Sequence, residues 1–387
     1  MSQLPSSQTV VSRRAVLKRG AVASAISIAG LSASSGAAAA QRCNIVVPDD
    51  YGTIQDAVNG ANNGDTICIR QGTYDEDVTV NKAVTLRGRN SPNGNNPAAL
   101  DGQIEITQDG EGASVRRLHI SPSETFLGGT FPDPAGVLVK ASDVVIENTV
   151  IEDFNADLSN GEGNFTLHGV QVFGAGVSDV TVRNNVIRGF KSDGDATTWP
   201  NYGGIAGVKA QAGVENVTIE ENEITDHHSI GWVWGVVLTS SDSDSGVPTD
   251  ITVEKNHISG LNDSSVYDVF ASANDGRDAA PYPGSAFGID AHADASEATV
   301  RQNNLLAPNG VESKDGDGTL VAECNWWDDR SGPTHDDNPD GEGIWALERG
   351  SATVDYTPWL IAPAPSNACV GGKGGGIGNG VGNSANQ

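Results

Sequence analysis

The chain has 387 residues, and its composition and charge exclude several classes of protein. Hydrophobic residues make up 37%, below the ~45 to 50% of an average soluble protein, while glycine reaches 48. Acidic residues outnumber lysine plus arginine by 50 to 23, which gives a formal net charge of −27. These values exclude a fibrous protein and a bundle of membrane helices. They also argue against a nucleic acid or an anionic membrane as partner.

The first 40 residues have the pattern of an export signal. Residues 12–18 read Ser-Arg-Arg-Ala-Val-Leu-Lys, the twin-arginine order, and an Ala/Ser-rich run ends at Ala40 in an A-x-A cleavage pattern. A transmembrane anchor, the alternative, needs ~20 strongly apolar residues, and 20–40 holds too many Ser, Gly and Ala. We predict a twin-arginine signal peptide over 1–40 and a secreted, extracellular mature chain that starts at Gln41 and inserts in no membrane.

The mature chain is expected to be adapted to salt. Segment 1–40 holds four basic residues and no acid, so 19 basic against 50 acidic side chains remain, a net charge of −31. Of the acids 33 are Asp, and only 7 lysines lie beyond residue 40. A hydrated anionic surface of this kind favours a halophilic protein that stays soluble in concentrated salt.

Four cysteines in an exported chain predict disulfides. They fall into two terminal pairs, Cys43 with Cys68 and Cys324 with Cys369. Four cysteines allow three connectivities, and this pairing is preferred because each bond joins segments near one end. Zinc is the alternative, but no C-x-x-C spacing occurs and no histidine lies close by in sequence.

An internal repeat decides the fold. Five segments align without gaps, each a short alternating strand, a polar turn and a second short strand: 144–151, 180–187, 217–224, 251–258 and 298–305. Their sixth position is occupied by Thr149, Asn185, Asn222, Asn256 and Asn303. Asparagine recurring at one turn predicts a ladder in which the amides of successive coils bond to each other.

A second element, with the pattern Gly-apolar-x-apolar-x, precedes each of these turns. It starts at Gly136, Gly169, Gly207, Gly235, Gly288 and Gly310. Three short strands in each coil of ~35 residues predict an all-β chain, a right-handed parallel β-helix. The alternative, an antiparallel sandwich, needs hairpin signals every 8 to 12 residues and no asparagine in register.

The ends of such a coil need caps, because unpaired strand edges are exposed there. Residues 53–65 predict a short amphipathic capping helix over the first coil. Aromatic residues around Trp326 and Trp359 are expected to close the last coil. We predict a single β-helix domain over 41–370 and a disordered Gly-rich tail over 371–387.

Several strings resemble a known family. Residues 64–67, 72–82 and 84–88 are similar to the opening of pectin-lyase-like right-handed parallel β-helix proteins, including pectin methylesterases. The coils rich in asparagine and the ending over 325–333 and 356–360 resemble secreted prokaryotic β-helix repeat proteins of that superfamily. The resemblance implies the fold. The catalytic motifs of methylesterases, D-F-I-F-G and L-G-R-P-W, do not occur, so no catalytic residue is carried over.

Long loops recur at one point of the repeat, over 152–168, 189–206, 225–234 and 259–287, and predict a groove wall on one side of the coils. Aromatic rings beside acids suit sugars, whose C–H faces stack on rings while their hydroxyls bind carboxylates. The expected substrate-binding residues are Trp199, Tyr202, Trp232, Trp234 and Tyr282. The alternative for any one of them is that it only anchors its loop.

The strand beside these loops supplies candidate catalytic residues. In Gly-apolar-x-apolar-x the third and fifth residues point outward. The third column reads Leu138, Gln171, Lys209, Val237, Asp290 and Glu312, and the fifth reads Lys140, Phe173, Gln211, Thr239, His292 and Lys314. Stacking at ~4.8 Å is expected to pair Asp290 with Glu312 and so to raise one pKa. A solvated outer face is the alternative.

Three functions fit these residues, all acting on a polysaccharide and with the chain expected to be a monomer. A polysaccharide lyase would use Lys209, Arg277 or His292 to take the proton next to a uronate carboxylate. A glycoside hydrolase would use Asp290 and Glu312. A non-catalytic envelope or carbohydrate-binding protein would use the same groove only to bind.

No residue pattern requires a cofactor, and calcium is the one candidate. Asp336, Asn338 and Asp340 match the first half of a calcium-binding loop, D-x-N-x-D-G. The twelfth position is Leu347 in place of the usual Glu, so a solvated turn is the alternative.

Overall fold

The computed structural model describes residues 42–127, 134–157, 166–193, 204–229, 232–239, 246–263, 286–292, 298–314, 318–348, 351–364 and 369. Within these ranges the side chains of Leu127, Asp193, Asp263, Ala286, Phe287, Asp290, His292 and Lys314 are not described. The chain divides into Met1–Gln41 and Arg42–Gln387, and the fold given below is that of the second unit. The predicted signal peptide and the tail over 371–387 lie outside the described residues.

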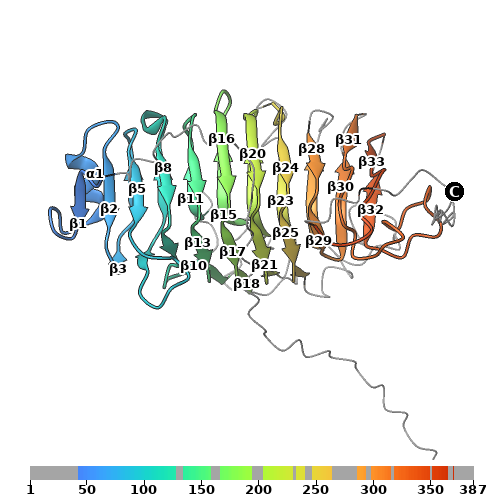
Figure 1. Ribbon diagram of the computed structural model, residues 1–387, viewed down its shortest axis with the longest axis horizontal. Coiled ribbons are helices and arrows are strands. Elements are labelled where there is room, and N and C mark those ends of the chain that lie inside the picture. The colour runs from blue at the N-terminus through green and yellow to red at the C-terminus, as the bar shows by residue number, and fades with distance from the viewer. Residues whose placement is uncertain are drawn as a thin grey trace, which may run out of the picture. The chain divides into compact units, whose positions relative to one another are not determined.

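The described strands form parallel sheets that the chain visits in turn, so that strands of successive coils lie side by side (Figure 1). The eleven-stranded sheet holds β1 (Ile45–Val47), β2 (Thr66–Ile69), β5 (Thr85–Gly88), β8 (Ser114–Arg116), β12 (Val145–Glu147), β16 (Ser178–Arg183), β20 (Glu215–Glu220), β24 (Thr252–Glu254), β28 (Thr299–Arg301), β31 (Thr319–Val321) and β33 (Thr353–Asp355). The eight-stranded sheet holds β3 (Gly72–Asp75), β6 (Ala98–Asp101), β9 (His119–Ile120), β13 (Val150–Glu152), β17 (Val186–Arg188), β21 (Glu223–Thr225), β25 (His257–Ser259) and β29 (Asn304–Leu306).

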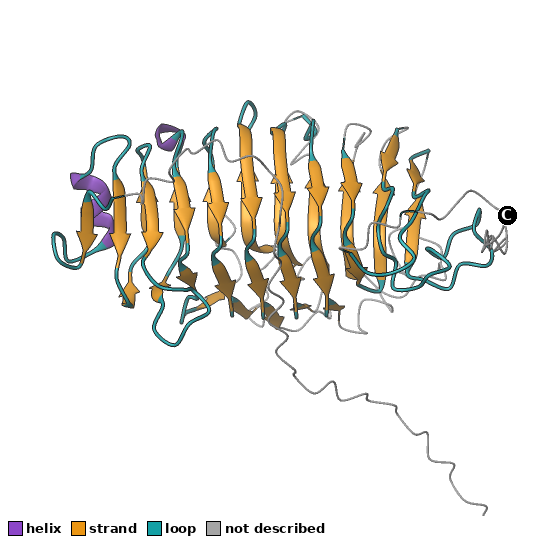
Figure 2. Cartoon of the chain, viewed as in Figure 1, coloured by secondary structure: helices purple, strands orange, loops and turns teal. Residues whose placement is uncertain are grey.

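The nine-stranded sheet carries the repeated glycine motif. It holds β4 (Val78–Val80), β7 (Ile104–Ile106), β11 (Ala135–Val139), β15 (Thr166–Phe173), β19 (Gly204–Gln211), β23 (Val233–Thr239), β27 (Ala286–His292), β30 (Asn309–Lys314) and β32 (Trp345–Glu348). Every strand pair in these sheets is parallel, for example β15 with β19, and the register shifts only between β30 and β32, at Asn309 and Val311. The predicted parallel β-helix is therefore confirmed, and Figure 2 shows how strongly strands dominate over helix.

A fourth set of strands was not predicted. The five-stranded sheet holds β10 (Thr125–Leu127), β14 (Asn155–Asp157), β18 (Lys191–Asp193), β22 (His228–Ser229) and β26 (Asn262–Asp263). The prediction of three strands per coil is thus wrong for the coils that contain these strands. Segments of two or three residues are too short to show alternation, so their pairing depends on the neighbouring coils.

The asparagine ladder is confirmed and is longer than predicted. Asn185 Nδ2 donates to Asn222 Oδ1 at 3.0 Å, and Asn222 Oδ1 also accepts the backbone N–H of Asn185 at 3.0 Å. The same bonds join Asn222 to Asn256, Asn256 to Asn303 and Asn303 to Asn325. The ladder residues are buried, so the bonds satisfy amides that water cannot reach.

The glycine column has a steric cause. A Cβ at Gly169 would collide with the Cγ2 of Ile187 and with the backbone carbonyl of Gly207 in the next coil. Gly136, Gly207 and Gly235 meet the same two kinds of atom. Sheet and corner approach each other so closely at this position that only glycine fits.

The interior is filled by the apolar residues of every strand and by one stack of rings. Phe154 and Phe190 stack at 4.8 Å between ring centroids, and His227 continues the stack at 4.9 Å from Phe190. His227 is fully buried, and burial lowers its pKa from 6.5 to about 3. The imidazole is therefore neutral at physiological pH.

A short helix and several buried aromatic residues lie near the two ends of the described coils. The helix α1 (Ile54–Gly60) packs against β1, β2 and β4, and it buries Ile54, Ala57 and Val58. A short 3₁₀ helix, η1, covers Gln108–Gly110. At the other end Trp327 is fully buried in the core, which also contains Tyr356 and Trp359. No helix of the described ranges is long and apolar enough to cross a membrane.

Both predicted disulfides are present. Cys43 is bonded to Cys68 and Cys324 to Cys369, with Cα atoms 5.5 and 5.3 Å apart. Each bond closes a loop, of 25 and 45 residues, at one end of the coils. The zinc alternative for these cysteines is thereby ruled out.

Candidate functional site

The candidate site lies on the outward face of the nine-stranded sheet. Val170 and Val172 of β15 and Val208 and Ala210 of β19 point into the core, so the residues between them face outward. The outward column runs in register through Gln171, Lys209, Val237, Asp290 and Glu312. The predicted alignment of Asp290 with Glu312 and of His292 with Lys314 is present.

The outward column is not a solvated surface, the alternative that the sequence left open. Gln171 is 6% exposed, Val237 3% and Glu312 0%. Glu312 has Leu347 of β32, which is also buried, as its register partner on the other side. A carboxylate enclosed in this way is not placed to meet a polymer from solvent in the described conformation.

Lys209 is partly open to solvent, in contrast to Glu312 of the same column. Its near neighbour His168, on β15, is fully buried, and neither ring nitrogen has a hydrogen-bond partner among the described residues. Burial lowers the pKa of His168 well below 6.5, and the Lys209 ammonium lowers it further. The site therefore combines a lysine with an imidazole that stays neutral at physiological pH.

His168 was not among the residues predicted from the sequence. It stands directly before the glycine of the motif, and its register partners on β11 and β19 are Ala135 and Ala206. The signal available in the sequence was a histidine at a position that holds alanine in the two neighbouring coils. The sequence alone did not show that this position lies beside Lys209, because Leu167 and Val170, three residues apart, both lie in the core and so interrupt the simple alternation.

Two amides frame Lys209. Gln171, its register partner, donates from Nε2 to Oε1 of Gln211 at 3.1 Å. Gln211 follows Lys209 by two residues on β19, so it faces the same side of the sheet. The amide nitrogen of Gln211 donates to no acceptor among the described residues. This group can donate to a ligand that lies against Lys209.

Of the predicted aromatic residues, the structure brings two together. Trp232 and Trp234 stack with ring centroids 5.7 Å apart at 29°, and both are partly exposed. Trp234 is the register partner of Ala206, beside His168. Trp199, Tyr202, Tyr282 and Arg277 lie outside the described residues, and the side chain of His292 is not described.

The predicted calcium loop shows a turn held by its own atoms. Asn338 donates from Nδ2 to the carbonyls of Ser331 at 3.0 Å and Pro333 at 2.7 Å, while Asp336 and Asp340 are exposed. In the described ranges no three side chains of His, Cys, Asp or Glu converge as a metal site would require. These observations do not test calcium binding, which stays a prediction.

The family described as right-handed β-helix region matches residues 102–356. The chain belongs to this family. The resemblance to pectin-lyase-like β-helix proteins is confirmed at the level of fold, and the handedness predicted for the coil is that of the family. No curated protein matches the chain significantly.

Solved structures similar to this right-handed β-helix protein include three enzymes. The PL6 family alginate lyase AlyGC is 17% identical, with a TM-score of 0.38, over 73% of this chain and 33% of its own. Pectate lyase Pel9A is 12% identical, with a TM-score of 0.34, over 80% and 73%. Rice weevil pectin methyl esterase is 15% identical, with a TM-score of 0.32, over 81% and 89%. At these values the similarities carry no argument about activity.

Proposed function

We propose that the outward face of the nine-stranded sheet binds an acidic polysaccharide outside the cell and cleaves it by β-elimination. The observation that carries the proposal is the position of Lys209, partly exposed beside the neutral His168 and framed by Gln171 and Gln211. Positive charge is scarce in this chain, with 7 lysines beyond residue 40. Three of them, Lys140, Lys209 and Lys314, belong to strands or strand ends of this one face.

The chemistry needs a positive group for the uronate carboxylate, a base that takes the C5 proton, and a proton for the C4 oxygen, whose bond to C4 breaks as the C4–C5 double bond forms. Lys209 supplies the positive group, because a neutralised carboxylate makes the neighbouring proton more acidic. Gln211 donates from its amide to the same carboxylate or to a hydroxyl. Trp232 and Trp234 offer ring faces for a sugar further along the polymer. The base we assign is His292, on β27, two strands beyond β19 in the nine-stranded sheet. Once protonated, the imidazole gives the proton to the leaving C4 oxygen.

The test is an assay of the purified mature protein on alginate, polygalacturonate and a neutral glucan. Unsaturated uronate, read by its absorbance, is expected from an acidic substrate only. Lys209→Met is expected to lower the rate by a factor on the order of 10² to 10⁴, because it removes a group that acts in the transition state. Lys191→Met, on the five-stranded sheet, is the matched control and is expected to keep full activity.

A glycoside hydrolase is the second candidate, because Asp290 and Glu312 pair in register at the distance of neighbouring strands. The burial of Glu312 counts against it. New reducing ends without unsaturated uronate, lost in Asp290→Asn and Glu312→Gln, would replace the lyase by the hydrolase. Binding of a polysaccharide without any cleavage would leave the non-catalytic carbohydrate-binding protein.

A further inference from the structure

A pocket lies away from the nine-stranded sheet, at the corner between the eleven-stranded and eight-stranded sheets. The corner before β9, the corner before β13 and the corner before β17 each consist of two residues. Between β5 and β6 the same corner is replaced by residues 89–97. This insertion reaches over the following corners and encloses about 460 Å³ with them, a volume typical of small-molecule sites. We call it the corner pocket.

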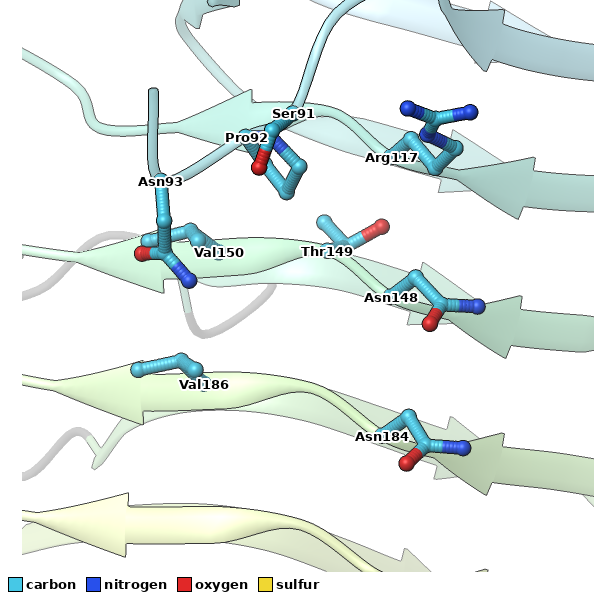
Figure 3. A pocket seen from close by; sticks show the side chains of 9 residues that line it. All are labelled: Ser91, Pro92, Asn93, Arg117, Asn148, Thr149, Val150, Asn184 and Val186. Atoms are coloured by element: carbon cyan, nitrogen blue, oxygen red, sulfur yellow. The ribbon is translucent and has the colours of Figure 1, made fainter. Parts of the chain in front are cut away.

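The corner pocket is built from a polar rim and an aliphatic floor (Figure 3). Asn93, on the insertion, reaches toward Val150 and Val186, which lie on successive coils. Asn148 and Asn184 point parallel to each other and away from the two valines, one coil apart, hence ~4.8 Å along the stack. Amides that can donate and accept, beside aliphatic surface, match the hydroxyls and C–H face of a sugar ring.

The insertion is held in place by its own bonds. Asn90 donates from Nδ2 to the carbonyl of Asn96 at 2.8 Å and to Gln71 Oε1 at 3.3 Å. A turn bond from the N–H of Gly94 to the carbonyl of Ser91, at 3.0 Å, closes the tip. The pocket wall is therefore formed before any ligand arrives, which lowers the entropic cost of binding.

Arg117 gives the corner pocket its charge. The neighbouring arginines Arg116, Arg183 and Arg188 all form ion pairs with glutamates. Arg117 is exposed and forms no ion pair with any described residue, although acids outnumber basic residues by 50 to 23. Its guanidinium at the pocket rim can take a carboxylate with two parallel hydrogen bonds.

We propose that the corner pocket binds a carboxylate-bearing sugar, a uronate, with Arg117 on the carboxylate and the asparagine amides on the hydroxyls. This site is separate from the sheet that carries Lys209. It binds whether or not the chain cleaves a polymer.

The test is calorimetric titration of the mature protein with sodium D-glucuronate, with D-glucose as the neutral comparison. We expect saturable binding of glucuronate and at least tenfold weaker binding of glucose, because glucose lacks the carboxylate. Arg117→Ala is expected to abolish the binding of glucuronate at the corner pocket. Arg330→Ala removes an equal charge from an exposed position outside the pocket and is expected to bind as the wild type does.

Two further variants keep the result decisive. Arg117 has φ of +58°, a conformation that glycine adopts without steric cost, so Arg117→Gly removes the side chain without straining the backbone. Lys209→Met is expected to retain the sites lost in the Arg117 variants. The proposal is overturned if the wild type binds no glucuronate, if glucose binds as tightly, or if folded Arg117→Ala and Arg117→Gly bind like the wild type. Loss in Lys209→Met alone would move the binding to the nine-stranded sheet and also overturn it.

Discussion

Two fully buried histidines, His168 and His227, are both kept neutral by burial but have different surroundings. His168 lies on the outward face beside Lys209, whereas His227 is inside the coil and stacks on Phe190. The Nδ1 atom of His227 accepts a long hydrogen bond of 3.4 Å from the N–H of Phe190, and Nε2 has no partner among the described residues. His227 therefore acts mainly as a ring in the stack.

This burial predicts a loss of stability in acid. The folded imidazole of His227 has a pKa of about 3, while the unfolded one takes up a proton below 6.5. Between these values the unfolded state binds more protons, so stability falls as the pH falls, by up to ~1.4 kcal/mol per pH unit. His227→Phe is expected to extend the ring stack. Between pH 6.5 and 4.5 its free energy of unfolding is expected to fall by ~2 kcal/mol less than that of the wild type.

Urea unfolding at the two pH values measures this difference. His228→Gln changes the next residue, on β22, and is the matched control with the acid sensitivity of the wild type. An equal loss of stability in His227→Phe and the wild type would show that His227 does not carry the effect.

At the scale of an element, strand and corner approach each other closely at each repeated glycine of the nine-stranded sheet, and this leaves no room for a side chain. A Cβ at Gly207 would collide with Ile224 Cγ2 and lie 2.7 Å from the carbonyl of Gly235. Because backbone atoms of the next coil cannot move independently, we expect Gly207→Ala to cost ~2 to 4 kcal/mol. Gly52→Ala, with no atom within 4 Å of its Cβ, is the control and is expected to change stability by less than ~1 kcal/mol. Equal urea midpoints for the two variants would refute the steric account.

Repeated elements were predictable from sequence because each coil imposes the same demand. The asparagine at the turn and the glycine within β15, β19 and β23 recur at a fixed place, and both have a structural cause. The five-stranded sheet was missed, since its strands are too short to show a period. The corner pocket was also missed, because residues 89–97 occur once and a single insertion has no repeat to reveal its position.

The candidate site was predicted only in part, for a related reason. Register placed Lys209 beside Gln171 and Asp290 beside Glu312 correctly. Exposure was not predictable, since the burial of Glu312 depends on neighbours such as Leu347 that belong to a different coil. Alternation states which way a residue points and says nothing about what covers it.

At the scale of the whole molecule, charge is organised across coils. Glu147 pairs with Arg116 at 2.9 Å and Arg183 at 2.6 Å, one from each neighbouring coil, and Glu254 pairs with Lys255 and Arg301. These pairs occupy many of the scarce basic groups. The remaining acids therefore repel each other over the surface of a chain whose residues 41–387 carry a net charge of −31.

Stability is accordingly expected to rise with salt. At 2 M NaCl the screening length is below ~3 Å, so repulsion between surface carboxylates is almost abolished. The melting temperature of the mature protein is expected to be higher in 2 M than in 0.1 M NaCl. Sodium chloride is preferred over sulfate, which strengthens apolar burial in any protein. The same melting temperature at both concentrations would contradict the salt-adapted interpretation.

The asparagine ladder also has a first and a last member. Thr149 turns its hydroxyl back to the carbonyl of Glu147 in its own coil, and Asn325 donates to the carbonyl of Ala322 in its own coil. From the following coil, each inner asparagine needs only another asparagine amide as its hydrogen-bond partner. After duplication or deletion of one inner coil, the same amide bonds could therefore form between the coils that become neighbours, whereas the coils of Thr149 and Asn325 make different bonds at the two ends. The number of coils is thus a quantity that evolution, or an engineer, can change one unit at a time.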